Sequence, residues 1–426
     1  MESFLVEGGA RLEGEIEVSG AKNASLKLAA AALLAPGKTV LHDVPRIKDV
    51  KTMLAVLEGL GAESSFNGRT LEIDTSGVDS FTAPYELVRQ MRASIVVLGP
   101  LVARFGEAEV SAPGGCNLGL RKFNFHLDGL RSLGAEVELD HGFIKATAPG
   151  GLKGAEINFE YPSVTATENV MMAAVLADGI TIIENGAREP EVVNLAEFLN
   201  SMGARVQGAG TGRIEIEGVE ELTSVEWTVM PDRIEAGTYM MAVAATGGDV
   251  TIRNARPEHL KMELEKLWEM GVSVTTLGGV RVRVEDPAQL SGVDVSTLPF
   301  PGFATDLQAQ MMVVLTQASG VGIITENVYE NRLQVAEELN RMNAGIDLFG
   351  GHRALIRGPR KLSGTIVQAP DLRGGAALVL AGLVADSTTV VDGARHILRG
   401  YENFEEKLSR LGATVAFQEA GSPVVP

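Results

Sequence analysis

The sequence has one cysteine, Cys116, among 426 residues. A single thiol excludes an internal disulfide framework and a zinc site made of several cysteines. The six histidines show no spacing typical of metal ligands, and the sequence contains no Walker-type phosphate loop. We therefore expect the protein to use neither a metal ion nor a cofactor.

The sequence also lacks long apolar runs. The apolar stretches at 29–34 and 95–100 are much shorter than the roughly 20 residues that span a bilayer. The N-terminal residues MESFLVE carry an acid where a signal peptide would carry lysines. We therefore expect a cytoplasmic protein with no membrane partner.

Positive charge is scarce, since 37 lysines and arginines stand against 55 acidic residues, for a net charge of −18. This balance argues against a nucleic-acid partner, which would require a broad basic surface. An anionic small molecule remains compatible with the sequence if lysines and arginines gather in one local pocket.

What the sequence does contain is an internal repeat of about 70 residues, present in six copies. Each copy has an amphipathic helical pattern that ends at a glycine or asparagine and leads into a strand-like run. These pivot residues are Gly61, Gly134, Gly203, Gly271, Asn343 and Gly412. Glycine and asparagine are the residues that most readily adopt the left-handed conformation found after a helix C-terminus.

Each copy also has a second helical pattern that is apolar on all sides. These patterns begin near Lys22, Arg92, Thr165, Asp232, Thr305 and Asp371. Such helices are buried, whereas the runs that follow them, such as 181–183 and 389–391, are typical of strands. The sequence thus predicts an α/β protein of six units in two domains of three, with helices inside and short-stranded sheets outside. A solenoid is the competing interpretation, but its units usually have about 20–45 residues.

The segment 208–212, Gly-Ala-Gly-Thr-Gly, superficially resembles a nucleotide-binding loop. It lies between two strand-like runs, so we predict that it is a hairpin turn.

Cys116 lies in the glycine-rich segment 112–119. A lone cysteine is often a small buried hydrophobic residue, but the residues around this one lack apolar periodicity. This context favours an exposed, reactive thiol, with Arg121 and Lys122 stabilising its thiolate.

Asp306 precedes an apolar helix, where a carboxylate either stabilises the helix dipole or takes part in chemistry. Three arginines follow irregular stretches, and each alone is compatible with a solvated surface position; they are Arg332, Arg373 and Arg399. Charged residues occur at the same phase of nearly every repeat. We therefore expect these helix starts to converge on one cleft between the two domains.

Taken together, these segments resemble the UDP-N-acetylglucosamine 1-carboxyvinyltransferase family of enolpyruvyl transferases. The resemblance covers almost the whole chain and rests on ordered motifs at the family's spacing. These are Gly20-Ala21-Lys22-Asn23, Met91-Arg92-Ala93-Ser94, Pro113-Gly114-Gly115-Cys116, Pro231-Asp232-Arg233-Ile234-Glu235, Thr305-Asp306-Leu307-Gln308-Ala309-Gln310, Glu330-Asn331-Arg332, Asp371-Leu372-Arg373 and Arg399-Gly400-Tyr401-Glu402.

The resemblance implies the two-domain enolpyruvyl-transferase fold, an inside-out α/β barrel. One domain would be 21–229, which carries the cysteine loop, and the other would be 1–20 plus 230–426, with the active site in the cleft between them. The implied reaction transfers enolpyruvyl from phosphoenolpyruvate to the 3-hydroxyl of UDP-N-acetylglucosamine and releases phosphate, as the first committed step of peptidoglycan synthesis.

The resemblance also assigns roles to residues. The implied catalytic residues are Cys116, Asp306, Lys22 and Arg399. Cys116 would protonate the methylene carbon of phosphoenolpyruvate, and Asp306 would be the base for the acceptor hydroxyl. The phosphate would contact Lys22, Arg121 and Arg399, and the carboxylate would contact Arg332 and Arg373. The other implied substrate contacts are Asn23, Arg92, Lys122, Phe123, Asn124, Phe125, Tyr161, Pro162, Ser163, Val164, Val328 and Asp371.

Two acceptor segments differ from the family pattern. The first is usually Arg-Pro-Val-Asp-Leu-His or Arg-Pro-Ile-Asp-Leu-His in the family. Here it is Arg121-Lys122-Phe123-Asn124-Phe125-His126. The second, usually Lys-Val-Ser-Val-Gly-Ala, is here Tyr161-Pro162-Ser163-Val164-Thr165-Ala166. These changes remove an Asp acceptor and a Lys donor and add two Phe, and such exchanges can redirect specificity.

Three hypotheses therefore stand at the level of sequence. The first is transfer to UDP-N-acetylglucosamine. The second is transfer to another nucleotide acceptor, such as a nucleoside monophosphate in specialised metabolism. The third is a non-catalytic paralogue that binds a UDP-sugar and regulates a partner, which the intact Cys116, Asp306 and arginine set disfavours.

Overall fold

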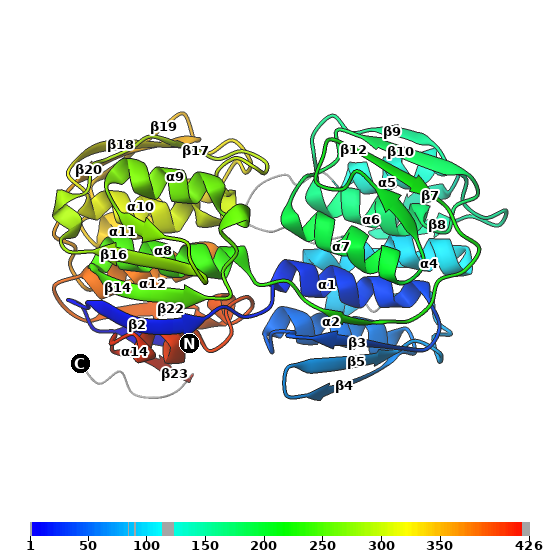
Figure 1. Cartoon of the computed structure of the whole chain (residues 1–426), viewed down its shortest axis with the longest axis horizontal. Coiled ribbons are helices and arrows are strands. Elements are labelled where there is room, and N and C mark those ends of the chain that lie inside the picture. The colour runs from blue at the N-terminus through cyan, green and yellow to red at the C-terminus, as the bar shows by residue number, and fades with distance from the viewer. Residues whose placement is uncertain (1, 84, 89–90, 113–122, 420–426) are drawn as a thin grey trace. The chain divides into compact units, whose positions relative to one another are not determined.

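The computed structural model in Figure 1 describes residues 2–83, 85–88, 91–112 and 123–419. The chain forms two compact units. The terminal unit contains the chain up to Ser19 and from Pro231 onward, and the central unit lies between Gly20 and Met230. Within the described ranges, none of the helices is both long enough and apolar enough to cross a membrane.

In its described part, the central unit has three sheets. Their strand orders are β13-β3-β5-β4, β6-β8-β7 and β11-β12-β10-β9. The strands are β3 (Lys38–His42), β4 (Glu63–Asn67), β5 (Thr70–Asp74), β6 (Glu107–Ser111), β7 (Glu136–Asp140), β8 (Phe143–Thr147), β9 (Glu156–Asn158), β10 (Ile180–Glu184), β11 (Arg205–Gln207), β12 (Arg213–Glu217) and β13 (Glu226–Thr228). The segment 208–212 connects the antiparallel strands β11 and β12, as predicted for a hairpin turn.

Along the chain, the helices of the central unit are interspersed among these strands. They are α1 (Lys22–Ala31), η1 (Ala32–Leu34), α2 (Lys48–Gly59), α3 (Tyr85–Val88), η2 (Arg92–Val97), α4 (Leu98–Phe105), α5 (Asn124–Ser132), α6 (Val164–Ala174) and α7 (Pro190–Ser201). The apolar helix expected near Arg92 begins as the 3₁₀ turn η2, because the β-branched run Ile95-Val96-Val97 lowers helix propensity there.

The terminal unit has three four-stranded sheets among its described residues, with the orders β21-β22-β1-β23, β15-β16-β14-β2 and β17-β18-β20-β19. The strands are β1 (Ser3–Val6), β2 (Leu12–Glu17), β14 (Gly248–Arg253), β15 (Ser273–Thr275), β16 (Val280–Val284), β17 (Val295–Ser296), β18 (Gly320–Thr325), β19 (Ile346–Phe349), β20 (Arg353–Gly358), β21 (Ile366–Gln368), β22 (Thr389–Asp392) and β23 (Val415–Gln418). Strand β1 pairs with β22 and β23, so the N-terminal segment completes a sheet of the C-terminal chain.

The helices of the terminal unit follow the same plan. They are α8 (Arg233–Thr246), η3 (Pro257–His259), α9 (Lys261–Met270), η4 (Pro287–Gln289), η5 (Thr305–Leu307), α10 (Gln308–Gln317), η6 (Arg332–Gln334), α11 (Val335–Arg341), α12 (Leu372–Val384), α13 (Ala394–Ile397) and α14 (Phe404–Arg410).

The structure confirms the predicted repeat and layering. All six pivot residues have a positive φ, from 71° at Asn343 to 108° at Gly203. The apolar helices are buried almost throughout, as in α10 and α12. The sheets bury one face only, so β12 buries Ile214 and Ile216 and exposes the charged residues that alternate with them, Arg213, Glu215 and Glu217. Each unit thus has helices inside and sheets outside, around its own core.

Candidate active site

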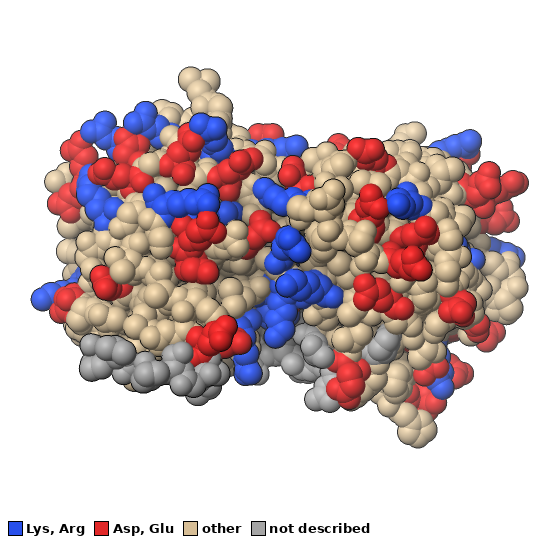
Figure 2. Space-filling view, turned by 90° about the horizontal axis from the view of Figure 1, so that it is seen from below, with Lys and Arg blue, Asp and Glu red and all other residues tan. Residues whose placement is uncertain are grey.

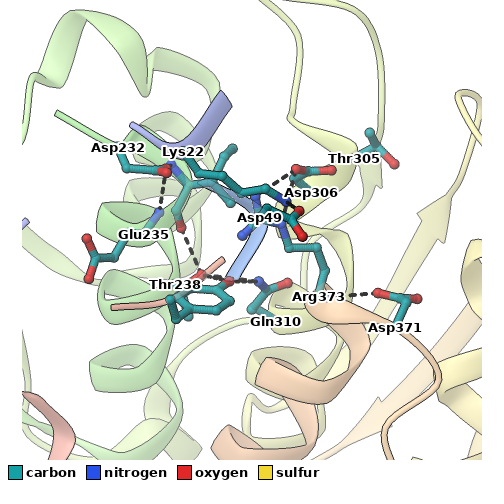
Figure 3. A network of polar contacts seen from close by, with 12 residues as sticks. Lys22, Asp49, Asp232, Glu235, Thr238, Thr305, Asp306, Gln310, Asp371 and Arg373 are labelled. Atoms are coloured by element: carbon teal, nitrogen blue, oxygen red, sulfur yellow. Dashed lines mark hydrogen bonds and ion pairs between the residues drawn. The ribbon is translucent and has the colours of Figure 1, made fainter. Parts of the chain in front are cut away.

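In the terminal unit, the carboxylate of Asp306 lies between two arginines. Its Oδ1 is 2.8 Å from Nη2 of Arg332. Its Oδ2 is 3.0 Å from Nη2 and 3.1 Å from Nε of Arg373 (Figure 3). The two arginine side chains are only 4% and 5% exposed, whereas Asp306 is 26% exposed. The structure therefore brings together three of the predicted site residues.

Three short segments position this cluster. Asp306 belongs to the 3₁₀ turn η5 before α10, and Arg332 begins η6. Asp371 caps α12, because its Oδ1 accepts from the backbone N–H of Arg373 at 2.7 Å and of Gly374 at 3.0 Å. Asp371, predicted as a substrate contact, thus fixes the backbone from which Arg373 projects.

Arg332 has further partners. Its Nη1 donates to Oγ1 of Thr305 at 3.2 Å, and that hydroxyl donates to Oε2 of Glu326 at 2.9 Å. Oε1 of Glu326 accepts from the backbone N–H groups of Val328 and Tyr329. The predicted acceptor contact Val328 therefore belongs to a turn that is tied to Arg332 through two side chains.

Arg373 lies over the ring of Tyr401, 5.3 Å from its centroid. The hydroxyl of Tyr401 is 2.9 Å from Oγ1 of Thr238, whose own proton goes to the carbonyl of Ile234 at 2.8 Å. Tyr401 therefore donates to Thr238. Nε2 of Gln310 donates to Oγ1 of Thr238 at 3.1 Å (Figure 3) and to the hydroxyl of Tyr401 at 3.3 Å. Thr238 and Gln310 therefore hold the hydroxyl of the tyrosine whose ring lies against Arg373.

Electrostatics keep both arginines charged. Burial lowers the pKa of Arg332, but the combined effect of Asp306, Asp371, Tyr329 and Glu326 outweighs burial and raises that pKa above its usual value. For Arg373, burial is likewise outweighed, by Tyr401 and then Asp306, and the pKa is raised. Burial raises the pKa of Tyr401, so the phenol remains protonated near neutral pH. The cluster therefore consists of two charged arginines, both of which pair with the carboxylate of Asp306.

In the central unit, Lys22 opens α1 and its Nζ is 2.8 Å from Oδ2 of Asp49 in the first turn of α2. Both side chains are largely buried. Asp49 was not among the predicted site residues. Its position at the start of an amphipathic helix was visible in the sequence, but its contact with Lys22 was not, because it joins two separate helices. Asn23 follows on α1 and is half-buried.

The described part of the first acceptor segment, 123–126, forms the start of α5. Phe123 and Phe125 are partly buried against the core, and Asn124 is exposed. The ring of Phe125 contacts that of Phe159 edge to face, with centroids 6.0 Å apart. The second acceptor segment leads into α6, where Tyr161 is exposed and its three successors, Pro162, Ser163 and Val164, are half-buried.

A buried hydrogen-bond network joins these two segments. Oδ1 of Asn169 accepts from the backbone N–H of Gly99 at 2.8 Å, so its Nδ2 donates to Nδ1 of His126 at 3.0 Å. Nε2 of His126 then carries the proton and donates to Oγ1 of Thr165 at 3.2 Å. The start of α5 is thereby held against the start of α6 by uncharged groups.

The remaining predicted residues are placed as follows. Arg399 lies just after α13 and is half-buried. Arg92 opens η2, but its side chain is outside the description, as are Cys116, Arg121 and Lys122 entirely. Among the residues described, no three His, Cys, Asp or Glu side chains are grouped as metal ligands. Acidic side chains are scattered over the visible face of each unit, with basic ones among them (Figure 2).

Comparison with known proteins gives a consistent result. The family model for EPSP synthase (3-phosphoshikimate 1-carboxyvinyltransferase) matches residues 6–408. A UDP-N-acetylglucosamine 1-carboxyvinyltransferase from Desulfosudis oleivorans is 52% identical, covering 97% of this chain and 99% of that protein. UDP-N-acetylglucosamine 1-carboxyvinyltransferase 2 from Carboxydothermus hydrogenoformans is 51% identical with the same coverage.

Solved structures agree on the fold. The enolpyruvyl transferase NikO from Streptomyces tendae is 26% identical with a TM-score of 0.86, covering 98% of both chains. EPSP synthase from Acinetobacter baumannii is 19% identical with a TM-score of 0.74, covering 98% of this chain and 100% of that one, and supports the fold alone. The predicted enolpyruvyl-transferase fold is confirmed. The chain therefore belongs to the EPSP synthase family and, within it, to the UDP-N-acetylglucosamine 1-carboxyvinyltransferases, which are enolpyruvyl-transferring enzymes.

Proposed function

We propose that this enzyme transfers the enolpyruvyl group of phosphoenolpyruvate to the 3-hydroxyl of UDP-N-acetylglucosamine and releases phosphate. In this proposal it acts in the cytoplasm, at the first committed step of peptidoglycan synthesis. The observation that carries the proposal is the pair of buried arginines that meets on one carboxylate, in a chain about half identical to enzymes named for this reaction. That identity favours UDP-N-acetylglucosamine over a nucleoside monophosphate as the acceptor.

The arginine pair suits the carboxylate of phosphoenolpyruvate. Arg332 and Arg373 are almost fully buried and remain charged, so each can present a guanidinium fork in a site with little competing water. In this proposal Lys22, Arg121 and Arg399 hold the phosphate group. Residues of both units thus take part in one reaction.

The proposed chemistry has two steps. In the first, Cys116 gives a proton to the methylene carbon of phosphoenolpyruvate while the acceptor oxygen bonds to the neighbouring carbon. The hydroxyl proton passes to Asp306. In the second, the bond to the phosphate oxygen breaks and the departing phosphate takes the proton from Asp306. The Cys116 thiolate takes a proton from the new methyl group, which restores the double bond and the starting state of both residues. Each positioned proton transfer contributes roughly 10²–10⁴-fold to the rate.

The direct test is to identify the products. The protein is incubated with phosphoenolpyruvate and UDP-N-acetylglucosamine, and the nucleotide is analysed by mass spectrometry while phosphate is assayed. We expect one phosphate for each acceptor that gains an enolpyruvyl group. Asp306→Ala should lose most turnover while it still binds the acceptor. Phosphate release without a change in acceptor mass, or no reaction at all, would refute the proposal.

A further inference from the structure

The two buried arginines of the terminal unit already hold a carboxylate, and it belongs to the chain itself. Asp306 gives one oxygen to Arg332 at 2.8 Å and the other to Arg373 at 3.0 Å. This is the two-point arrangement in which guanidinium groups recognise a carboxylate ligand. Asp306 therefore occupies the groups that, under the proposed function, receive the carboxylate of phosphoenolpyruvate.

The arginines are the fixed members of this cluster. Arg332 donates to Thr305 and lies over the ring of Tyr329, with 5.1 Å between guanidinium carbon and ring centroid. Arg373 lies over Tyr401, whose hydroxyl is itself held by two neighbouring side chains. These contacts leave the forks in place whether or not Asp306 is paired with them.

Asp306 is the member that a ligand can replace. Its side chain is 26% exposed, more than five times the exposure of either arginine, so an incoming anion meets Asp306 before it meets Arg332 or Arg373. Two carboxylates cannot share one pair of guanidinium groups at full strength, since like charges in contact repel. Binding of one must weaken the hold on the other.

We propose that the carboxylate of phosphoenolpyruvate displaces Asp306 from Arg332 and Arg373, and that this exchange releases Asp306 to act as the base for the acceptor hydroxyl. The inference rests on the proposed function and extends it. A carboxylate relieved of two guanidinium partners accepts a proton more readily. Binding of the first substrate therefore prepares the base that the second substrate needs.

The exchange has a measurable consequence, because self-occupation of the arginine pair reduces the affinity for phosphoenolpyruvate. If about nine-tenths of the molecules have Asp306 on the pair, the apparent dissociation constant is weakened about tenfold. Removing the proposed catalytic base should therefore tighten the binding of this substrate while it abolishes turnover.

The experiment measures the dissociation constant of phosphoenolpyruvate by equilibrium dialysis in the absence of acceptor. All variants carry Cys116→Ser, because the proposed thiol could otherwise react with the ligand. Asp306→Asn is expected to bind phosphoenolpyruvate about tenfold more tightly than the Cys116→Ser protein. Asp306→Ala should change the affinity in the same direction, which guards against an asparagine that remains on the arginines.

Asp249→Asn is the matched control. It removes a negative charge of the terminal unit that pairs with the exposed Arg281 on β16 and not with the arginine pair. The affinity of this variant for phosphoenolpyruvate should change by no more than about twofold. Unchanged or weaker binding in both Asp306 variants, or a gain no larger than in Asp249→Asn, would overturn the exchange.

Arg373→Gln in the same background separates the two proposals. If it weakens phosphoenolpyruvate binding while the Asp306 variants do not tighten it, the exchange is wrong and the proposed function stands. If it leaves the affinity unchanged, the arginine pair does not hold this carboxylate, and both the exchange and the assigned binding role fail.

Discussion

Two polar clusters, one in each unit, are built in opposite ways. In the terminal unit, Asp306 is held by two arginines whose charges are supported by hydrogen bonds and aromatic rings. In the central unit, the acceptor segments are joined by the uncharged chain from Asn169 through His126 to Thr165. The first arrangement depends on charge and the second on the direction of each hydrogen bond.

This difference teaches how one enzyme family can keep its chemistry and vary its acceptor. Two buried arginines bind a carboxylate strongly, so neither arginine can be substituted without loss of the reaction. A network of uncharged groups discriminates between substrates through the hydrogen-bond donors and acceptors that it leaves available to them. The departures from the family pattern, such as Phe123 and Phe125, lie in the acceptor segments that the neutral network joins.

The largest expected effect falls on the charged cluster. Arg373→Gln removes one guanidinium fork, and we expect kcat/KM for phosphoenolpyruvate to fall by about 10³-fold. The measurement is phosphate release as a function of phosphoenolpyruvate concentration. Arg341→Gln is the control, since Arg341 is an exposed arginine of the same unit paired with Glu338. An equal effect of both variants would show that the pair has no special role.

The next effect concerns the central unit's buried carboxylate. Glu168 is fully buried on α6, and burial raises its pKa to about 7 despite Lys27 at 3.2 Å. Within the described chain, its oxygens have no hydrogen-bond donor other than Lys27. The folded state thus retains a proton that the unfolded state releases above about pH 4.5. Stability from this group is present below pH 4.5 and is lost as the pH rises to about 7.

Glu168→Gln should remove this loss. Relative to the unsubstituted protein, its free energy of unfolding should improve by up to about 3 kcal/mol between pH 4.5 and 7. Denaturant titrations in a Trp268→Phe background report the central unit alone, through Trp227 packed against Phe198. The exposed Glu197→Gln serves as control and should show no such trend. If the difference in free energy of unfolding between Glu168→Gln and the unsubstituted protein does not change with pH, the loss of stability does not come from Glu168.

The smallest effect tests the neutral network. Thr165→Val keeps the side-chain shape but removes the oxygen that accepts from His126, whereas Thr165→Ser keeps it. We expect the valine variant to raise KM for the acceptor about tenfold, because a buried donor loses this partner. KM for phosphoenolpyruvate and kcat should change little. If serine and valine behave alike, or if KM rises for both substrates, the network does not position the acceptor segments.

The charged cluster was the more predictable of the two regions. Asp306, Arg332 and Arg373 stand in ordered motifs, so a family resemblance could assign them, and the pivot residues such as Asn343 revealed the repeat without any resemblance. The network of Tyr401, Thr238 and Gln310 was not predictable, since it joins residues far apart in the chain. Their geometry depends on how α8 and α10 pack with the segment between α13 and α14.

Other features could not be predicted from the sequence, each for a reason of its own. Asp371 was expected to contact substrate, and its capping of α12 became visible only with the backbone geometry. Asp49 meets Lys22 across two helices. The Lys27 and Glu168 pair was hidden because sequence patterns indicate which helices are buried but not which faces meet. The roles of Cys116 and Arg121 remain predictions from the sequence, outside the described residues.

The measurement that tests the central claim most directly is kcat/KM for phosphate release across a panel of acceptors. The panel contains UDP-N-acetylglucosamine, other UDP-sugars, UMP and shikimate 3-phosphate, each with saturating phosphoenolpyruvate. The account predicts that UDP-N-acetylglucosamine is preferred over every other acceptor, so that the altered segments rebuild a pocket for it. Turnover with UMP or another acceptor and none with UDP-N-acetylglucosamine would contradict the proposed function while leaving the arginine chemistry intact.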